Sequence, residues 1–163
     1  MKFFKILSSS KGLTLIEVLV SLTILSIILL GIMNFFNQAY SYTNSNQKKT
    51  AAINVARNAL TYMEQSSGTN SFIALRQRLE DNPDEEGTLR ICDSSYKVFW
   101  NGEKQECDPI TINNVTYNVT IVPTLDENNT AYFIPLTVNV DWTVKRHDYT
   151  TSMEGTIKSE DLR

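Results

Sequence analysis

One uninterrupted apolar stretch near the N-terminus constrains what this chain can fold into more than any other feature. It runs from Leu13 to Phe36, and Glu17 is its only charged residue. An α-helix needs about 20 predominantly apolar residues to cross the hydrocarbon core of a bilayer, and this stretch is longer than that. The sequence therefore predicts a membrane-spanning helix.

The carboxylate of Glu17 is unusual in such a helix. A charged side chain near the centre of a membrane helix costs about 2.5–3.5 kcal/mol on insertion scales. An acid kept at that cost marks a candidate functional residue. The alternative is that Glu17 lies one turn inside a plain signal anchor, close enough to the headgroups to stay hydrated.

The residues around Glu17 follow a recognisable order. A short basic leader ends in Gly12, then Leu13-Thr14-Leu15-Ile16 precede the acid, and the apolar run continues to Phe36. This order resembles the class III signal of type IV pilins and of the pseudopilins of type II secretion and competence systems. A secretory signal peptide differs, because its apolar region is shorter and its cleavage site follows that region. Gly12 as an ordinary linker residue is the remaining alternative.

The resemblance implies a role for three residues. A prepilin peptidase would cut between Gly12 and Leu13, and the new amino group of Leu13 would be N-methylated. Glu17 would then meet the terminal amine of a neighbouring subunit during filament assembly. The implied partners are other pilin or pseudopilin subunits, the prepilin peptidase and an inner-membrane assembly platform.

The leader also predicts the orientation in the membrane. It contains Lys2, Lys5 and Lys11 and no acid, so the positive-inside rule places the N-terminus in the cytoplasm. The globular part would then be extracytoplasmic, and after assembly it would lie in a surface filament or a periplasmic pseudopilus. Loss of the three leader lysines changes the formal net charge from −3 to −6. That acidic balance argues against nonspecific nucleic-acid binding, which depends on clustered cations.

Helical periodicity resumes beyond the apolar run. Apolar side chains at Ile53, Ala56, Leu60 and Met63 form one stripe, which Ala52 and Ala59 widen. We expect one helix from Leu13 to about Ser66, with Gly68 as its stop. The expected segments are a leader (1–12), a transmembrane or filament-core helix half (13–36), an amphipathic helix half (37–67) and a globular β-rich domain (68–163). A short helix is expected at 70–79.

Alternating apolar residues predict a sheet in the globular domain. The clearest alternation runs from Tyr132 to Val144, and shorter strands are expected at 88–91, 96–100, 110–112, 115–122 and 149–157. Asn101-Gly102 predicts a two-residue hairpin after Trp100, and 145–148 predict the last turn. Pro135 predicts an edge or a bulge, because it cannot donate to a ladder. The expected fold is α+β, with the long helix packed on a C-terminal antiparallel meander, and the pilin resemblance implies the same arrangement.

The remaining side chains that could carry chemistry are few. Cys92 and Cys107 suit a disulfide in an oxidising compartment, and closing a loop of about 15 residues would contribute about 3 kcal/mol; two unpaired buried thiols are the alternative. These cysteines and His147, expected in a turn, are too few for a zinc site. We find no phosphate-binding or catalytic motif, so neither a catalytic residue, a metal nor a cofactor is expected. The sequence therefore predicts a protein that is not an enzyme.

Within the pilin-like group, one position favours a minor subunit. Asn34 stands where major pilins often carry a helix-breaking proline, and the run from Leu29 to Ile32 resembles minor pilins and the I-type subunits of type II secretion. Retention of Glu17 argues against the tip pseudopilin that lacks this acid. The alternative function is a pilus-associated adhesin or a DNA-uptake binding module.

Overall fold

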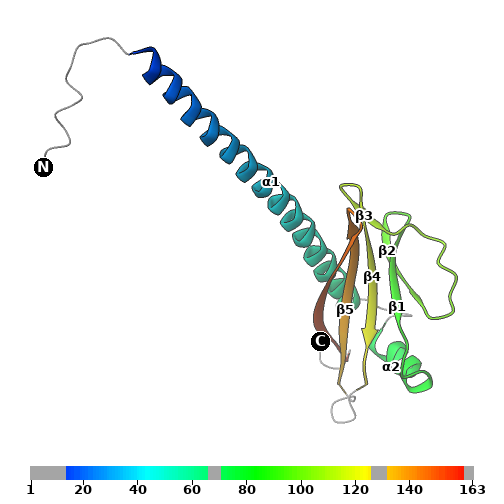
Figure 1. The fold of residues 1–163 in the computed structure, drawn as a ribbon. Helices are drawn as coiled ribbons and strands as arrows, with labels where there is room; N and C mark the ends of the chain where they lie inside the picture. The colour runs from blue at the N-terminus through cyan, green and yellow to red at the C-terminus, as the bar shows by residue number, and fades with distance from the viewer. Residues whose placement is uncertain (1–13, 66–70, 126–131, 160–163) are drawn as a thin grey trace, which may run out of the picture. The chain divides into compact units, whose positions relative to one another are not determined.

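The computed structural model describes residues 14–65, 71–125 and 132–159. The chain divides into two compact units, with Ser45 the last residue of the first and Asn46 the first residue of the second. Figure 1 shows the elements of both units. Each unit is described by itself below.

One long helix runs through both units. α1 spans Leu15–Gln65 and contains 51 residues. No proline interrupts it, and Gly31 is its only glycine, so nothing in its sequence breaks the hydrogen-bond ladder. The prediction of a single helix is confirmed for the described residues, whereas its expected stop at Gly68 lies outside them.

The second unit contains a short helix that caps its own first turn. α2 spans Phe72–Asp81, and the Ala74 N–H donates to Oγ of the N-cap residue Ser71 at 3.4 Å. Its buried residues are Phe72, Leu75 and Leu79, which helical spacing places on one side. The predicted short helix is confirmed with its start shifted by two residues.

The second unit also contains a six-stranded antiparallel sheet. Its strands are β1 (Gly87–Cys92), β2 (Ser95–Trp100), β3 (Ile110–Ile112), β4 (Val115–Pro123), β5 (Phe133–Val144) and β6 (His147–Lys158). Their order is β2-β1-β4-β5-β6, and β3 pairs with β4. Only β4, β5 and β6 form the simple meander that the sequence predicted.

β1 and β4 pair over a short stretch and then diverge; we call the opening between them the fork, and β3 lies in it. β1 pairs with β4 only from Gly87 to Leu89, while β3 pairs with the first residues of β4, from Val115 to Tyr117. The Ile91 N–H donates to the carbonyl oxygen of Asp108 at 3.0 Å. The segment that leads into β3 therefore lies where β1 has separated from β4.

The last hairpin turn lies where it was expected, whereas the first is made by other residues. Asp93 and Ser94, both with positive φ, connect β1 to β2, and Lys145 and Arg146 connect β5 to β6 in the same way. Positive φ at both central residues matches the right-handed twist of the strands. The hairpin predicted at Asn101-Gly102 is wrong, because β2 ends there and pairs with β1. His147 pairs with Val144 at the start of β6 and does not lie in a turn.

Pro135 is not in an edge strand, contrary to the expectation. It pairs with Thr156 of β6, and its carbonyl oxygen accepts from the Thr124 N–H at 2.9 Å, just beyond the end of β4. In an antiparallel ladder the N–H and C=O of one residue face the same neighbour. The donor that Pro135 lacks would therefore face Thr124. The reciprocal bond of that pair is missing, and the ladder between β4 and β5 ends at the preceding pair, Pro123 with Leu136.

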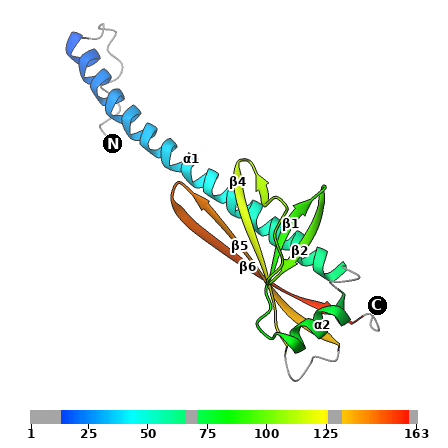
Figure 2. The same ribbon diagram turned by 90° about the vertical axis from the view of Figure 1, so that its right-hand side faces the viewer.

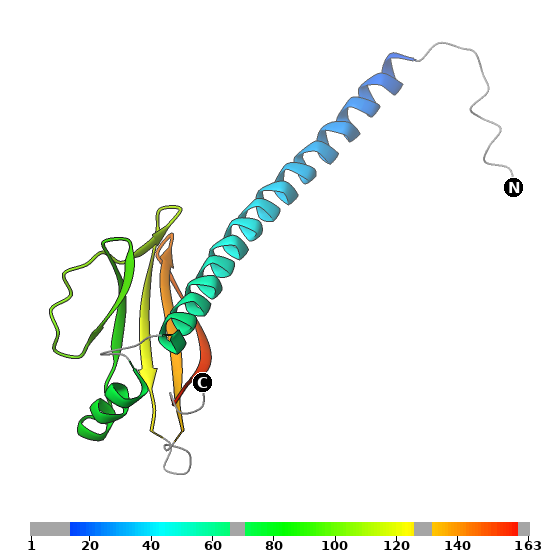
Figure 3. The ribbon, with the colours of Figure 1, turned by 180° about the vertical axis from the view of Figure 1, so that it is seen from behind.

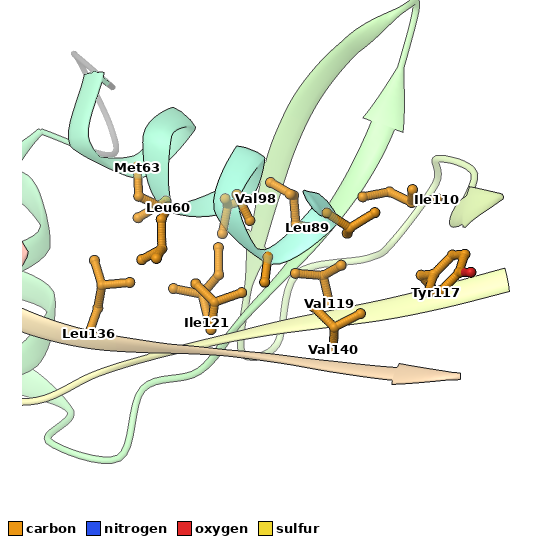
Figure 4. Packing of buried hydrophobic residues seen from close by; sticks show 14 of the residues in the cluster. Leu60, Met63, Leu89, Val98, Ile110, Tyr117, Val119, Ile121, Leu136 and Val140 are labelled. Carbon is orange, nitrogen blue, oxygen red and sulfur yellow. The ribbon is translucent and has the colours of Figure 1, made fainter. Parts of the chain in front are cut away.

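The core of the second unit lies between one face of the sheet and the part of α1 that begins at Asn46 (Figures 2 and 3). Figure 4 shows Leu60 and Met63 of α1 facing sheet residues such as Ile121 and Leu136. The buried residues of α1 are Ala52, Val55, Ala56, Ala59, Leu60 and Met63. Of the predicted stripe, only Ile53 is half-buried, and Val55 is the buried residue that the stripe missed.

The long alternating strand has its predicted buried face. Every second residue from Ile134 to Trp142 is buried, whereas Tyr132 precedes β5 and is 53% exposed. On β6, Gly155 allows a close approach, because a Cβ there would lie 2.6 Å from Cδ2 of Leu60. The α+β fold is confirmed, with the second half of α1 packed on the antiparallel sheet.

Candidate assembly site at the start of the first helix

The first turn of α1 contains a reciprocal capping interaction. Oε2 of Glu17 accepts hydrogen bonds from the Thr14 N–H and from Oγ1 of Thr14, both at 2.8 Å. The Glu17 N–H in turn donates to Oγ1 of Thr14 at 3.3 Å. A threonine followed three residues later by a glutamate is a capping box, in which each side chain satisfies a backbone N–H of the other residue.

The capping box changes the interpretation of Glu17. The first four N–H groups of a helix have no intrahelical acceptor, and the partial positive charge there favours a carboxylate. Glu17 therefore has hydrogen-bond partners within its own chain. Sequence reasoning missed this, although the Thr-x-x-Glu spacing ahead of an apolar run is a readable signal.

Both described hydrogen bonds to the carboxylate go to the same oxygen. Within residues 14–65 the bonds from Thr14 reach Oε2 of Glu17, and none is recorded to Oε1. An ionised carboxylate accepts about four hydrogen bonds through its two oxygens. Glu17 can therefore cap the helix and accept a further donor at the same time.

The helix that follows presents apolar side chains on every side. All residues from Leu15 to Phe36 are exposed, Leu15 by 82%. α1 is long and apolar enough to cross a membrane, and none of the residues in its most apolar window is buried. The hydroxyl groups in this stretch donate to carbonyl oxygens of the preceding turn, Ser21 to Glu17 at 2.7 Å and Ser26 to Leu22 at 2.8 Å. Internal satisfaction of polar groups is what a hydrocarbon environment requires.

Two of the predicted site residues cannot be placed. Gly12 and Leu13, the expected cleavage and methylation positions, lie outside the described residues. Peptidase cleavage and N-methylation therefore remain predictions. The structure brings only Glu17, of the three residues assigned by resemblance, into a defined geometry.

The predicted disulfide is present in the second unit. Cys92, the last residue of β1, is bonded to Cys107, and their Cα atoms are 5.2 Å apart. The alternative of two unpaired thiols is wrong. The hairpin predicted at Asn101-Gly102 would have placed Cys107 in a strand returning along β2, but Cys107 lies outside the strands, between β2 and β3. Cys107 ends a segment, residues 101–107, that we call the strap.

The strap is fastened to the sheet at several points besides the disulfide. The side chain of Gln105 donates to Oγ1 of Thr88 at 3.2 Å and accepts from Nη2 of Arg90 at 2.8 Å. Glu103 of the strap forms an ion pair at 3.5 Å with Arg78, whose guanidinium also lies 5.6 Å from the centre of the Trp100 ring. These contacts hold the segment that precedes β3 against β1 and β2.

The titratable side chains of the described residues are dispersed. No group of three or more His, Cys, Asp or Glu side chains converges in this part of the chain. A hollow of about 620 Å³ at one end of the sheet includes Asp141 and Asp148 among its lining residues, but no histidine, cysteine or lysine. His147 is exposed. The capped start of α1 is therefore the candidate functional site.

Comparison with known proteins gives one match. The family model described as the prokaryotic N-terminal methylation motif matches residues 7–33, which include Gly12, Leu13 and Glu17. No curated protein and no solved structure matches the chain. The match covers the site and most of the apolar run that follows it, and it does not extend into the second unit.

Proposed function

We propose, starting from the premise that this chain is a prepilin-type, pilin-like protein with a class III signal, that it serves as a minor pilin or pseudopilin subunit. It would belong to a type IV pilus or to a related competence or type II secretion filament. The observation that carries the proposal is the coincidence of the methylation motif with an exposed apolar helix whose first turn is capped by Thr14 and Glu17. A protein of this type is a structural component and not an enzyme.

The proposed mechanism is assembly through the first half of α1. Peptidase cleavage after Gly12 frees the amine of Leu13, one residue before the capping box. The assembly platform then transfers the helix from the membrane into a bundle of like helices. There Oε1 of Glu17 accepts a hydrogen bond from the protonated Leu13 amine of a neighbour, while Oε2 keeps its hydrogen bonds to Thr14.

The electrostatics of this pairing explain why a charge is kept in an apolar surface. An ion pair in a low-dielectric interior offsets part of the desolvation of both groups, whereas removing one partner leaves an uncompensated charge that costs about 3–5 kcal/mol. In the membrane, the hydrogen bonds from Thr14 lower the cost of the Glu17 charge. In the filament, the neighbour's amine pairs with that charge. The charge therefore favours subunits whose leaders have been removed.

Two sequence features support the finer assignments. Asn34 in place of a proline supports a minor subunit, because the helix continues through this position without a break. Lys2, Lys5 and Lys11 support a cytoplasmic N-terminus and an extracytoplasmic second unit. In this proposal the protein is first anchored in the membrane by α1, and it enters the filament only on assembly.

The most direct test is mass spectrometry of the N-terminus in cells with and without the prepilin peptidase. We expect a mature chain that starts at Leu13 and carries a methyl group when the peptidase is present. Without the peptidase, residues 1–12 should remain attached. A functional filament that contains the unprocessed chain would contradict the proposal.

Substitutions of Glu17 separate its two roles. Glu17→Ala removes both the cap and the charge, while Glu17→Gln keeps a side chain that can cap and removes the charge. If the charge pairs with a neighbour's amine, both variants should insert and be cleaved, and both should lose at least about 100-fold in filament incorporation, which corresponds to roughly 3 kcal/mol. Incorporation is measured in sheared filaments. Normal incorporation of the Gln variant alone would assign Glu17 to capping, and normal incorporation of both would refute the mechanism.

A further inference from the structure

Two exposed tyrosines follow the apolar run in the first unit. Tyr40 and Tyr42 are 73% and 74% exposed, and they lie within α1 just after the run ends at Phe36. The positions around them, from Asn37 to Ser45, are mostly polar. These are the first aromatic residues after Phe36, and the methylation motif does not include them.

The helical geometry places the two rings at one level and on opposite sides of the helix. Residues two apart are separated by about 200° around the axis and by about 3 Å along it. Tyr40 continues the stripe of Phe36, four positions earlier, and Tyr42 continues the stripe of Phe35, seven positions earlier. A single protein partner on one side of α1 cannot cover both rings, whereas a planar layer that surrounds the helix reaches both.

The axial spacing matches the layers of a bilayer. From Leu15 to Phe36 the helix rises about 32 Å, close to the roughly 30 Å of a hydrocarbon core. Tyr40 and Tyr42 then lie about 6 and 9 Å beyond Phe36, within the headgroup region on that side. At the other end, Thr14 lies at the opposite boundary of the core, and Glu17 lies about 3 Å inside it.

We propose that Tyr40 and Tyr42 form an aromatic anchor that binds the headgroup layer of the bilayer and fixes how deep α1 sits before assembly. Tyrosine is suited to this layer because its ring is apolar and its hydroxyl needs a hydrogen-bonding partner. The inference rests on the membrane placement in the proposed function, but not on processing or on the filament. It assigns a role to residues that lie outside the methylation motif.

The test uses the full chain in lipid nanodiscs with ¹³C-labelled tyrosine and phenylalanine rings. Spin-labelled lipids carry the nitroxide either at the headgroup or near the end of the acyl chain, and ring signals are assigned with single Tyr→Phe and Phe→Leu variants. We expect the headgroup label to broaden Tyr40 and Tyr42 more strongly than the acyl-end label does. The rings of Phe35 and Phe36 should show broadening by acyl labels, and Tyr62, Tyr96, Tyr117, Tyr132 and Tyr149 should show none from the acyl-end label.

The outcomes separate this inference from its premise. If Phe35 and Phe36 show no broadening by any lipid label, the helix is not in the bilayer and the membrane placement fails as well. If they are broadened but the two tyrosines respond only to a water-soluble relaxation agent, the anchor alone is refuted. If the tyrosine rings are shielded from both lipid labels and from water, a second copy covers them, and the lipid assignment is also refuted.

A pair of double variants tests whether the anchor sets the depth. Tyr40→Trp with Tyr42→Trp keeps amphipathic rings, while Tyr40→Ser with Tyr42→Ser removes them. We expect the ratio of headgroup to acyl-end broadening at Phe36 to stay unchanged in the Trp variant and to change at least about twofold in the Ser variant. An unchanged ratio in the Ser variant would show that the tyrosines do not hold the helix at its depth.

Discussion

The two halves of α1 bury their apolar side chains in different ways. Up to Ser45 the helix is the more apolar half, yet none of its described residues is buried. From Asn46 it is amphipathic, and it buries six residues, three of which are alanines, against the sheet of the second unit. The more hydrophobic half of the helix thus contributes nothing to the core of the protein.

This contrast teaches that the amount of hydrophobic surface does not predict where a core will form. A stripe on one face requires a partner within the chain, whereas a helix that is apolar all round requires an apolar surrounding. In the proposed function, the membrane and then other subunits supply that surrounding for the first half. The second half takes it from the strands of its own domain.

The strongest test of this contrast is to replace one large apolar side chain with alanine in each half. Met63 is fully buried, so Met63→Ala should lower the free energy of unfolding of the second unit by about 2–5 kcal/mol. Leu25→Ala removes a side chain that is exposed in the chain alone, so it should change that free energy by less than about 0.5 kcal/mol. Urea denaturation in detergent, followed by the fluorescence of the buried Trp100 and Trp142, measures both. Equal effects would mean that the two halves share one cooperative core.

Removal of the disulfide should have the next largest effect. Replacing Cys92 and Cys107 with serine opens a loop of about 15 residues, which costs about 3 kcal/mol in the chain-entropy model. The loss should appear as a lower denaturation midpoint, while membrane insertion stays unchanged because the first unit contains neither cysteine. Reduction of the wild type is the matched control and should reproduce the shift. A wild-type midpoint in the double variant would show that the strap is held by its other contacts.

The close approach of β6 to the helix predicts a smaller effect. A Cβ at Gly155 would overlap Cδ2 of Leu60, the end of a flexible side chain, so Gly155→Ala should cost about 1–3 kcal/mol through overpacking. Adding Leu60→Val shortens the opposing side chain and should recover part of that loss. A double-mutant cycle measures the coupling. Strict additivity of the two substitutions would contradict the proposed contact.

The smallest expected effect depends on pH. Tyr117 donates a hydrogen bond to the carbonyl oxygen of Lys48 at 3.3 Å, and burial raises the pKa of its hydroxyl. Because the folded state holds the proton more tightly, this contribution is complete below the unfolded pKa of about 10 and is lost as the pH rises through the folded pKa. Tyr117→Phe should flatten the decline in stability above about pH 10 relative to the wild type. Parallel stability curves for the two proteins would refute this role of Tyr117.

Local patterns in the sequence predicted most elements but not how they join. The stripe on α1 and the alternation from Ile134 to Trp142 each depend on one repeating spacing, and both are confirmed. The pairing of β1 with β4 and the insertion of β3 between them join residues far apart in sequence, which no local pattern records. The fork, and therefore the place of Cys107, could not be predicted for this reason.

One turn signal in the sequence was misleading, and one helix-capping signal was overlooked. Asn101-Gly102 has the composition of a hairpin turn, but Asp93 and Ser94 accept positive φ although neither is glycine. Aspartate tolerates this conformation better than most residues, so the signal was present and weaker. At the candidate site, the resemblance identified Glu17, while the capping partner Thr14 was readable from spacing alone and was missed.

The contact between Gly155 and Leu60 has a consequence for how the protein matures. The two residues are separated in the chain by α2 and by all of β1 to β5, so the packed surface of the helix is completed only when the last strand arrives. Contacts of such long sequence separation form slowly, and they leave unpaired surfaces exposed in the meantime. Synthesis of the C-terminus must therefore finish before the globular unit can close, and chains truncated ahead of β6 would remain open to proteolysis.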